Sequence, residues 1–416
     1  MKKVAIIGGG AAGLVTAINA AGKDIEVFLF DKNSNFGKKI LATGNGHCNY
    51  WNEDISLEHY HSSEEEMLKN YFAKLPKDEV VPFFENLGIV AKVKNGYYYP
   101  YSNQASSVRS LLVKEASKKG VIFCLDTTVL DIYKEGLKFV VKSKDGLEYF
   151  DQVVIATGSK ASFKTGSTGD GYLFAERFGH TVETVLPALV QVETSGSYLK
   201  KWAGVRTSAI VSLYEDNEFI KSEVGEIQLT DYGVSGICIF NLSHIIAKGL
   251  KNKKKEKLEI CFLPFLAMKD EKFLKNWLLE RERKLDGYLV TEFLEGILPY
   301  PLILTLLTCA FIPKNQVWGD LLETEKMKLF DMIMHFEVEA TGVKDFLQAQ
   351  VCSGGVKLSE VSSSLESKKV SGLYFVGEVL DVDGDCGGYN LGFAWMSGIL
   401  VGKTIRGDSC DSSSTN

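Results

Sequence analysis

The amino-terminal part of the chain alternates apolar runs with helical periodicity. Residues 4–7 form a continuous apolar run, residues 14–21 follow helical spacing, and residues 26–30 form a second apolar run. An apolar run of four to eight residues beside a turn signal is typical of a buried strand. The order therefore predicts a strand, a helix and a second strand.

The same alternation continues to about residue 185. Helical spacing predicts helices over residues 64–73, 77–87 and 106–119. Short strands are predicted over residues 121–124, 128–131 and 138–142. Residues 152–158 form an apolar run that ends in glycine, as buried parallel strands do.

The pattern changes twice in the rest of the chain. Residues 187–245 show short alternating runs separated by Gly and Asn, which predict antiparallel strands at 190–193, 207–214, 218–222 and 226–230. Residues 246–330 have helical spacing, most clearly at 273–285, 288–298 and 326–334. Strands return at 336–341, 348–352 and 372–377, before a final helix over 391–405.

A glycine-rich turn joins the first strand to the first helix. Gly8, Gly10 and Gly13 have the Gly-x-Gly-x-x-Gly spacing, and Asp31 ends the second strand. In a dinucleotide site the first glycine permits the turn, the second admits the pyrophosphate, and the third lets the helix pack closely. The amides at the helix start face the phosphate charge, and the acid reaches the ribose.

This organisation predicts an α/β fold with a Rossmann-like nucleotide domain built from both ends of the chain. A β-rich domain is inserted in it, and a helical domain is inserted in the β-rich domain, as loop positions tolerate insertions. The predicted boundaries are 1–186 and 347–407 for the nucleotide domain, 187–245 and 335–346 for the β-rich domain, and 246–334 for the helical domain. The Ser-rich tail, 408–416, is predicted to be disordered.

Two further segments carry candidate chemistry. The loop over residues 37–49 has no apolar periodicity, three glycines and two lysines, so its backbone can approach a phosphate-bearing ligand. The strand over residues 372–377 ends in Gly377-Glu378, and Gly387-Gly-Tyr-Asn-Leu391 opens the last helix. A carboxylate there can bind a ribityl hydroxyl, and amides at Asn390 and Leu391 can face developing negative charge.

Composition and charge narrow the class of protein. The chain has 416 residues, of which 45% are hydrophobic and 24% are charged. No apolar run approaches the roughly 20 residues that span a bilayer. The start Met1-Lys2-Lys3 leads into a strand without a signal peptide, so we expect a cytoplasmic protein. Eight scattered cysteines argue against a zinc site and a disulfide framework.

The net charge of −6 disfavours indiscriminate nucleic-acid binding, but residues 246–290 hold twelve basic and seven acidic residues. This local excess is either an ordinary solvated surface or a contact for a polyanion such as RNA.

Several motifs together resemble the BaiN/RdsA-type NAD(P)/FAD-dependent oxidoreductases over nearly the whole chain. They are the glycine turn at 4–14, Lys39-Ile-Leu-Ala-Thr-Gly-Asn-Gly-His-Cys-Asn49, Tyr99-Pro-Tyr-Ser-Asn-Gln-Ala-Ser-Ser107, Ala156-Thr-Gly158, Thr165-Gly-Ser-Thr-Gly-Asp-Gly171, 225–236, 377–384 and 387–391. The resemblance implies FAD, a Rossmann-like domain, a β-barrel-like insert and a helical cap.

Together with these motifs, the resemblance implies a set of cofactor-binding residues. Asp31 would hold the adenosine ribose, and Val129 would meet the adenine through its backbone. The full set is Gly8, Gly10, Ala11, Ala12, Gly13, Asp31, Lys32, Lys39, Thr43, Gly44, Asn45, Gly46, Cys48, Asn49, Val129, Ala156, Thr157, Gly158, Gly377, Glu378, Gly388, Asn390 and Leu391.

The chain departs from the family's commoner pattern at three places near the expected flavin. His47 stands where Arg is frequent, Tyr50-Trp51 where Leu-Thr is frequent, and Asp385-Cys386 where Pro-Thr is frequent. No second Gly-x-Gly-x-x-Gly unit with its own acid occurs. NAD(P)H is therefore expected to visit the flavin transiently as the electron donor.

The resemblance implies three activities: reduction of a conjugated C=C bond in steroid enones, reduction of uridine in ribosomal RNA, and oxidation of small amines or amino ketones. The first two share hydride transfer from flavin N5 to the carbon β to a carbonyl and protonation of the α carbon. We expect this ene-reductase class, with a small molecule or ribosomal RNA as substrate. Candidate catalytic residues are His47, Cys48 and Cys386, with Asp385 and Tyr389 as further possible acids. A non-catalytic flavin-binding, RNA-associated protein is the alternative.

Overall fold

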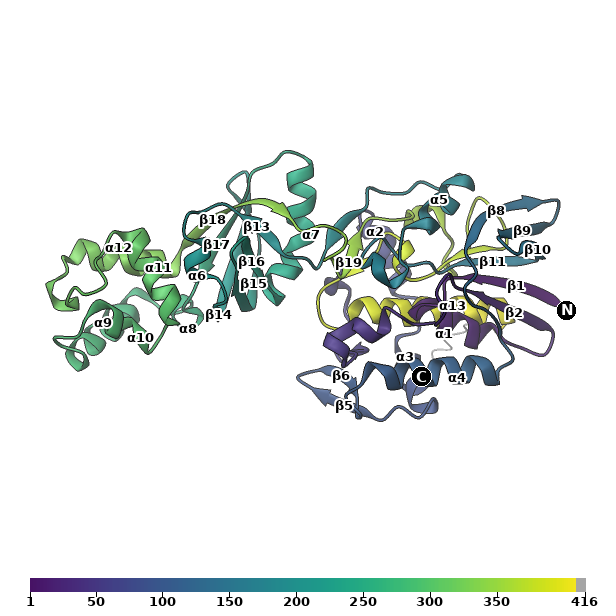
Figure 1. Ribbon diagram of the computed structural model, residues 1–416, viewed down its shortest axis with the longest axis horizontal. Coiled ribbons are helices and arrows are strands. Elements are labelled where there is room, and N and C mark those ends of the chain that lie inside the picture. Colours follow the sequence, from purple (N-terminus) through teal and green to yellow (C-terminus); the bar gives the residue numbers. More distant parts are fainter. Residues whose placement is uncertain (409–416) are drawn as a thin grey trace. The chain divides into compact units, whose positions relative to one another are not determined.

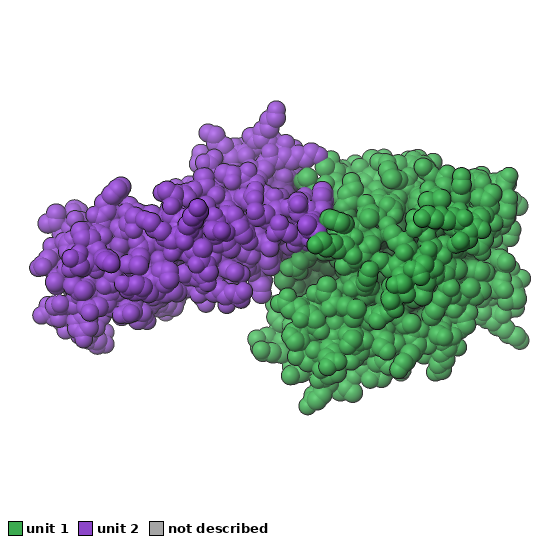
Figure 2. All heavy atoms as spheres, viewed as in Figure 1, with its two compact units in different colours: residues 1–186, 350–416 green, residues 187–349 purple. Residues whose placement is uncertain are grey.

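A computed structural model describes residues 1–408, which divide into two compact units (Figures 1 and 2). Unit 1 comprises residues 1–186 together with the chain from 350 onward, and unit 2 comprises residues 187–349. The prediction of a disordered tail falls on residues outside the described part, apart from Asp408. Within residues 1–408, no helix combines the length and the apolar character that crossing a membrane requires.

Unit 1 is built around a five-stranded parallel sheet of order β20-β11-β1-β2-β7. The strands are β1 (Lys2–Ile7), β2 (Ile25–Phe30), β7 (Ile122–Cys124), β11 (Gln152–Ile155) and β20 (Leu373–Phe375). β1 and β20 pair on opposite sides of β11, so strands from the two ends of the chain lie in one sheet. This confirms the Rossmann-like α/β prediction.

Helices flank this sheet, and smaller sheets extend unit 1. The helices are α1 (Ala11–Ala20), α2 (Glu65–Phe72), α3 (Lys77–Asn86), α4 (Ala105–Lys118), α5 (Asp170–Arg177) and α13 (Tyr389–Arg406). One antiparallel sheet has β8 (Val129–Glu135), β9 (Lys138–Ser143) and β10 (Gly146–Phe150), and another has β3 (Trp51–Asn52), β5 (Ala91–Lys94) and β6 (Tyr97–Pro100). The remaining strands are β4 (Tyr60–His61), which pairs with β21 (Asp383–Gly384), and β12 (Leu186–Ala188) and β19 (Val351–Ser353).

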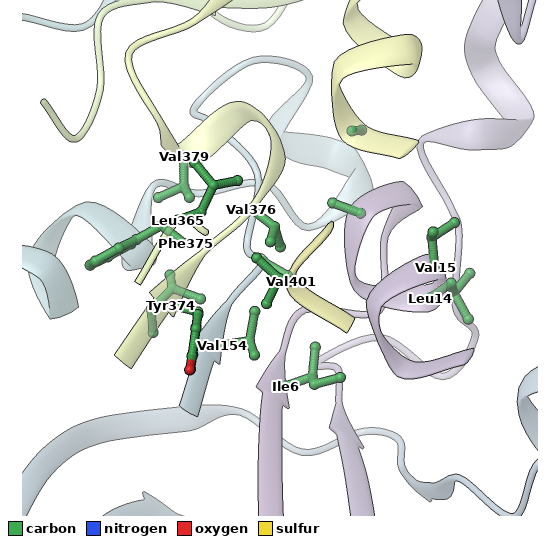
Figure 3. Packing of buried hydrophobic residues seen from close by; sticks show 14 of the residues in the cluster. Ile6, Leu14, Val15, Val154, Leu365, Tyr374, Phe375, Val376, Val379 and Val401 are labelled. Carbon is green, nitrogen blue, oxygen red and sulfur yellow. The ribbon is translucent and has the colours of Figure 1, made fainter. Parts of the chain in front are cut away.

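The core of unit 1 joins the sheet to its two central helices. Ile6 of β1, Val154 of β11 and Val401 of α13 lie close together, and Leu14 and Val15 are buried side chains of α1 (Figure 3). All five side chains are fully buried. Burial of an aliphatic side chain of this size contributes about 1.5–3 kcal/mol, so this contact zone fixes α13 against the sheet.

Unit 2 contains a closed antiparallel barrel with strand order β13-β16-β15-β14-β17-β18. The strands are β13 (Val192–Thr194), β14 (Arg206–Glu215), β15 (Glu218–Leu229), β16 (Gly233–Gly236), β17 (Glu256–Cys261) and β18 (Phe336–Val343). The helices are α6 (Leu199–Trp202), α7 (Ile237–Lys251), α8 (Pro264–Ala267), α9 (Glu271–Lys284), α10 (Val290–Glu295), α11 (Tyr300–Ala310) and α12 (Glu323–Met334). One hydrophobic core runs through both the barrel and the helices.

The structure corrects the predicted elements in unit 2. β17 lies inside the stretch predicted to be helical, and most of α7 lies inside the stretch predicted to be strands. The run of lysines before β17 hides the short apolar alternation of this strand in the sequence. Pairing with β14 and β18 sets its strand conformation. β15 is a single strand rather than two, because it also pairs with β14 over Glu223 to Gly225, between the two predicted strands. The domain boundaries within residues 187–349 stay a prediction.

A buried acid pair sits in the wall of the barrel. Glu256 of β17 is fully buried and stands opposite Glu215 of β14, and a Cβ on Gly249 of α7 would clash with its carboxyl. Burial, and next the Glu215 carboxylate, raise the pKa of Glu256 to about 8. Lys254 forms an ion pair with Glu215. Glu256 is therefore protonated at neutral pH.

We predict that Glu256→Gln removes a pH dependence of stability. Between the ordinary carboxyl pKa of 4.5 and about 8, only the unfolded chain loses this proton. The free energy of unfolding therefore falls by about 1.4 kcal/mol per pH unit in that window and is flat above it. Urea unfolding across this range should show the variant gaining stability relative to wild type as pH rises. The exposed Glu295→Gln is the control, and parallel pH profiles for all three proteins would contradict the assignment.

Candidate functional site

The glycine turn leaves the start of α1 open. Gly8 has φ +107°, and a Cβ there would lie 2.5 Å from the carbonyl oxygen of Ala156. A Cβ on Gly13 would clash with the Gly8 carbonyl, which agrees with a close-packing role. Gly10 is the N-cap residue, receives no side-chain cap from the described residues, and faces open space. Free amides and the helix dipole there suit a phosphate.

Asp31 lies directly beside this turn. Its Oδ2 accepts a hydrogen bond from the Gly9 amide at 2.9 Å, and its Oδ1 accepts from the Asn33 amide at 2.8 Å and from Asn33 Nδ2 at 2.9 Å. The Thr127 amide donates to the Asp31 carbonyl at 2.9 Å. This contact carries the chain toward Val129, which begins β8. The roles of Asp31 and Val129 toward a nucleotide stay a prediction.

A loop over residues 165–171 covers this side of the site. Asn33 Nδ2 donates to the Thr165 carbonyl at 3.1 Å. Lys32 Nζ contacts Asp170 Oδ2 at 2.6 Å and Thr168 Oγ1 at 2.5 Å. The sequence flagged this Gly-rich segment as a motif, but its spacing did not reveal that it folds back onto the end of β2. Asp170, Thr168 and Asn33 are thus candidate site residues that sequence reasoning missed.

The loop over residues 37–49 has a tightly turned backbone. Thr43 is extended, Gly44 and Asn45 are left-handed, and the Cys48 amide donates to the Thr43 carbonyl at 3.1 Å. Asn49 Oδ1 is buried and has no hydrogen-bond partner among the described residues. It lies 3.2 Å from the position that a Cβ on Gly388 would occupy. An orphaned acceptor beside a missing Cβ suits a ligand that donates a hydrogen bond.

The carboxyl-terminal segment meets both earlier segments. A Cβ on Gly377 would lie 2.9 Å from the Cβ of Ala12 in the first turn of α1. Glu378 Oε2 pairs with Lys39 Nζ at 2.7 Å and accepts from Ser159 Oγ at 3.0 Å. Lys39, Ser159 and Glu378 come from three distant parts of the sequence, and only the first and last were predicted.

Helices α1 and α13 run parallel and side by side. A Cβ on Gly398 would lie 2.9 Å from the Ala12 carbonyl oxygen, and one on Gly402 would lie 2.9 Å from the Thr16 carbonyl oxygen. Tyr389 precedes Gly398 by nine residues and Ala11 precedes Ala12 by one, so the start of α13 lies about 12 Å beyond that of α1 along the helix axis. The two helix starts thus point in the same direction and are offset along the helix axis.

The start of α13 also lacks a side-chain cap. Its N-cap residue Gly388 has φ +96°, and a Cβ there would lie 3.0 Å from the Trp51 carbonyl. The Asn390 side chain donates to the Gly384 carbonyl at 2.7 Å and accepts from the Gly384 amide at 2.9 Å. Only the backbone amides of Asn390 and Leu391 therefore suit the predicted ligand contact. An extended dinucleotide such as FAD fits the two open helix starts. Lys39 and the carboxylates of Asp31 and Glu378 supply polar groups beside them.

The candidate catalytic residues lie in different environments. His47 is exposed, and its Nδ1 donates to the Asn103 carbonyl at 2.9 Å. The Cys48 side chain is fully buried, and burial raises the pKa of its thiol to about 11. Burial, and next Asp385, raise the pKa of the partly accessible Cys386 to about 11 as well. Cys48 is therefore enclosed within the loop, whereas His47 and Cys386 are at least partly accessible.

Both carboxylate oxygens of Asp385 contact histidine side chains. His59 Nδ1 contacts its Oδ2 at 3.1 Å, and His61 Nε2 contacts its Oδ1 at 3.0 Å. The His59 ring stacks on Tyr389, with centroids 4.4 Å apart. Both histidines come from around β4 and escaped the sequence analysis, because single scattered histidines carry no spacing signal.

Comparisons with known proteins agree with this geometry. The family described as HI0933-like protein Rossmann domain matches residues 2–404. The chain is 40% identical over 415 residues to the 3-dehydro-bile acid delta(4,6)-reductase of Clostridium scindens. The matched region covers 97% of this chain and 98% of that protein. It is 27% identical over 407 residues to the ribosomal RNA dihydrouridine synthase of Haemophilus influenzae, covering 96% and 97%.

A solved structure shares the fold. The 3-ketosteroid delta1-dehydrogenase from Sterolibacterium denitrificans, in complex with 1,4-androstadiene-3,17-dione, has a TM-score of 0.51 and 11% identity, covering 98% of this chain and 100% of that one. At this identity the likeness concerns the fold alone.

We predict that Asp31→Ala and Glu378→Ala each weaken FAD binding by about tenfold or more, because each removes a charged hydrogen-bond acceptor worth about 1.5–3 kcal/mol. Fluorescence titration of the apoprotein with FAD measures the dissociation constant. The exposed Glu148→Ala, on β10, serves as the matched control. Either variant purified with full flavin and unchanged affinity would count against the site.

We further predict that the contact between Lys32 and Asp170 slows release of FAD. Lys32→Met and Asp170→Asn should each increase the FAD dissociation rate by about twofold to fivefold, since a partly exposed ion pair contributes at most about 1 kcal/mol. The rate is measured by trapping released FAD with an excess of competing apoprotein. If the pair acts as a unit, the double variant is no faster than either single one. Wild-type dissociation rates in both single variants would show that the contact between Lys32 and Asp170 does not slow FAD release.

Proposed function

The chain belongs to the HI0933-like family of FAD-dependent oxidoreductases, and from that premise we propose that it reduces a carbonyl-conjugated C=C bond with NAD(P)H as the electron donor. The observation that carries the proposal is the 40% identity, over nearly the full length of both chains, to an enzyme named 3-dehydro-bile acid delta(4,6)-reductase. A fused-ring enone of the steroid or bile-acid type is the proposed acceptor.

The residues of unit 1 have separate roles in this proposal. Bound FAD would supply a hydride from its N5 atom to the carbon β to the carbonyl. The open start of α1 binds the pyrophosphate, and Asp31 holds the adenosine ribose. Glu378, positioned by Lys39 and Ser159, accepts from a ribityl hydroxyl. The first-turn amides of α13 stabilise negative charge at the pyrimidine edge.

The proton for the α carbon needs a donor that is both accessible and protonated. Cys386 meets both conditions, because its raised pKa keeps the thiol protonated at neutral pH. His47 is accessible, and its Nδ1 carries a proton toward Asn103. Proton donation by Cys48 would require its enclosed thiol to move. We therefore propose that Cys48 supports the conformation of the loop over residues 37–49. Asp385, held by two imidazoles, positions its neighbour Cys386.

The donor would visit the site transiently. The Gly-rich segment at 165–171 packs onto the end of β2, with Asn33 bound to Thr165 and Lys32 bound to Asp170. It thereby serves the first dinucleotide site rather than forming a second one. Alternating occupation by NAD(P)H and acceptor gives ping-pong kinetics.

Reduction of uridine in ribosomal RNA is the second candidate. It is favoured by two relatives of that name, at 27% and 28% identity, and by the basic excess over residues 246–290. Ion pairs of Lys254 with Glu215 and of Lys257 with Glu337 offset part of that excess. The lower identities place this substrate second.

We predict NAD(P)H oxidation by the FAD-loaded enzyme that depends on a conjugated 3-keto bile acid, with the ring double bond saturated in the product. Mass spectrometry of the product and stopped-flow reoxidation of the flavin provide the measurements. Dihydrouridine in ribosomal RNA from cells with and without the gene tests the second substrate. Hydrogen peroxide formed from amino ketones, with no enone turnover, would instead favour the oxidase alternative and contradict the proposal.

A further inference from the structure

Two tyrosines share one face of β6. Strand residues alternate between faces, so Tyr97 and Tyr99 lie on the face opposite to Tyr98. Tyr98 turns toward the core, where its ring is 6.2 Å from that of Tyr50. Tyr97 and Tyr99 are both partly exposed. Two phenol rings thus stand next to each other on a half-covered surface.

These two rings span the segments that form the proposed flavin site. Tyr99 Cε1 lies 4.0 Å from the position of a Cβ on Gly44, in the loop over residues 37–49. Tyr97 Cε1 lies 3.0 Å from the position of a Cβ on Gly387, directly before α13. The Tyr389 ring approaches the same Gly387 position at 2.9 Å. The face of β6 therefore reaches from the flavin loop to the start of α13.

The wall formed by Tyr97 and Tyr99 is uncharged. Burial raises the pKa of both phenols. Cys386 is itself protonated at neutral pH. An uncharged aromatic surface can pack against the apolar rings of a ligand.

We infer that Tyr97 and Tyr99 bind the ring system of the electron acceptor, and that they select fused-ring enones over single-ring ones. This inference rests on the proposed function. Residues two apart on a strand are about 7 Å apart, so a ligand must extend over more than one ring to contact both phenols. A four-ring steroid does so, whereas a cyclohexenone or an isolated uracil contacts one.

The test replaces the rings and keeps the flavin. Tyr97→Leu and Tyr99→Leu in the FAD-loaded enzyme should each raise the dissociation constant of dihydrotestosterone by about tenfold, as measured from the flavin difference spectrum. The KM for testosterone should rise by a similar factor in both variants, whereas the KM for cyclohexenone should rise in at most one of the two. Tyr97→Phe and Tyr99→Phe keep the rings and should stay within twofold of wild type. The FAD dissociation constant should be unchanged in all four.

Tyr101→Leu is the matched control, because Tyr101 follows Tyr99 by two residues but is 70% exposed. If the Leu variants do not fold, Tyr97→Met and Tyr99→Met carry the same expectation. Unchanged steroid binding in the ring-free variants overturns the inference, as does an equal loss of FAD affinity, which would place the rings against the flavin. Absence of steroid binding by wild type also overturns it.

The outcomes separate this inference from the proposed function. Steroid binding that depends on both rings, without any enone reduction, supports the aromatic wall and removes the reductase activity. Enone reduction that is indifferent to both rings supports the reductase and removes the wall.

Discussion

The close packing of α13 against α1 is the constraint on which the site depends. Gly398 and Gly402 bring the α13 backbone to the Ala12 and Thr16 carbonyls, and any side chain at either glycine would push the helices apart. Because the helices are parallel, their positive ends face the same way and repel each other weakly. An extended ligand with negative charge near each start would offset that repulsion. The fold therefore places two like-oriented helix starts where negative charge of a ligand is favourable.

The acidic groups of the site are positioned before any ligand arrives. A carboxylate offers about four lone-pair sites. At Asp31 three are used by Gly9 and Asn33, and at Glu378 Oε2 takes both Lys39 and Ser159. Each group thus keeps limited capacity for a hydroxyl donor while its orientation is fixed by the protein. Such preorganisation lowers the entropy lost on binding, which suits a cofactor that remains bound through many turnovers.

Contiguous features of the site could be predicted from the sequence, whereas features assembled by tertiary contacts could not. The glycine turn, Asp31 and the Gly377-Glu378 strand end are local patterns with a fixed chemical meaning, and the structure brings them together. The contact of Lys32 with Asp170 joins residues 138 positions apart and has no local signal. β17 and α7 were misplaced for the same reason, since barrel pairing rather than periodicity decides their conformation. Ser159 and the histidines around Asp385 became visible only through their partners.

Two of the three departures from the resembled family's pattern, Tyr50-Trp51 and Asp385-Cys386, both lie beside the start of α13. Asp385 replaces a residue that cannot bind two imidazoles, and here it joins β4 to the approach of α13 through His59 and His61. Cys386 follows it and lies beside Tyr97 and Tyr99. Trp51 packs its ring 3.2 Å from the position of a Cβ on Gly392, so the same helix turn is shaped from the other side. Both changes alter the surroundings of the start of α13 and leave the glycine turn before α1 intact.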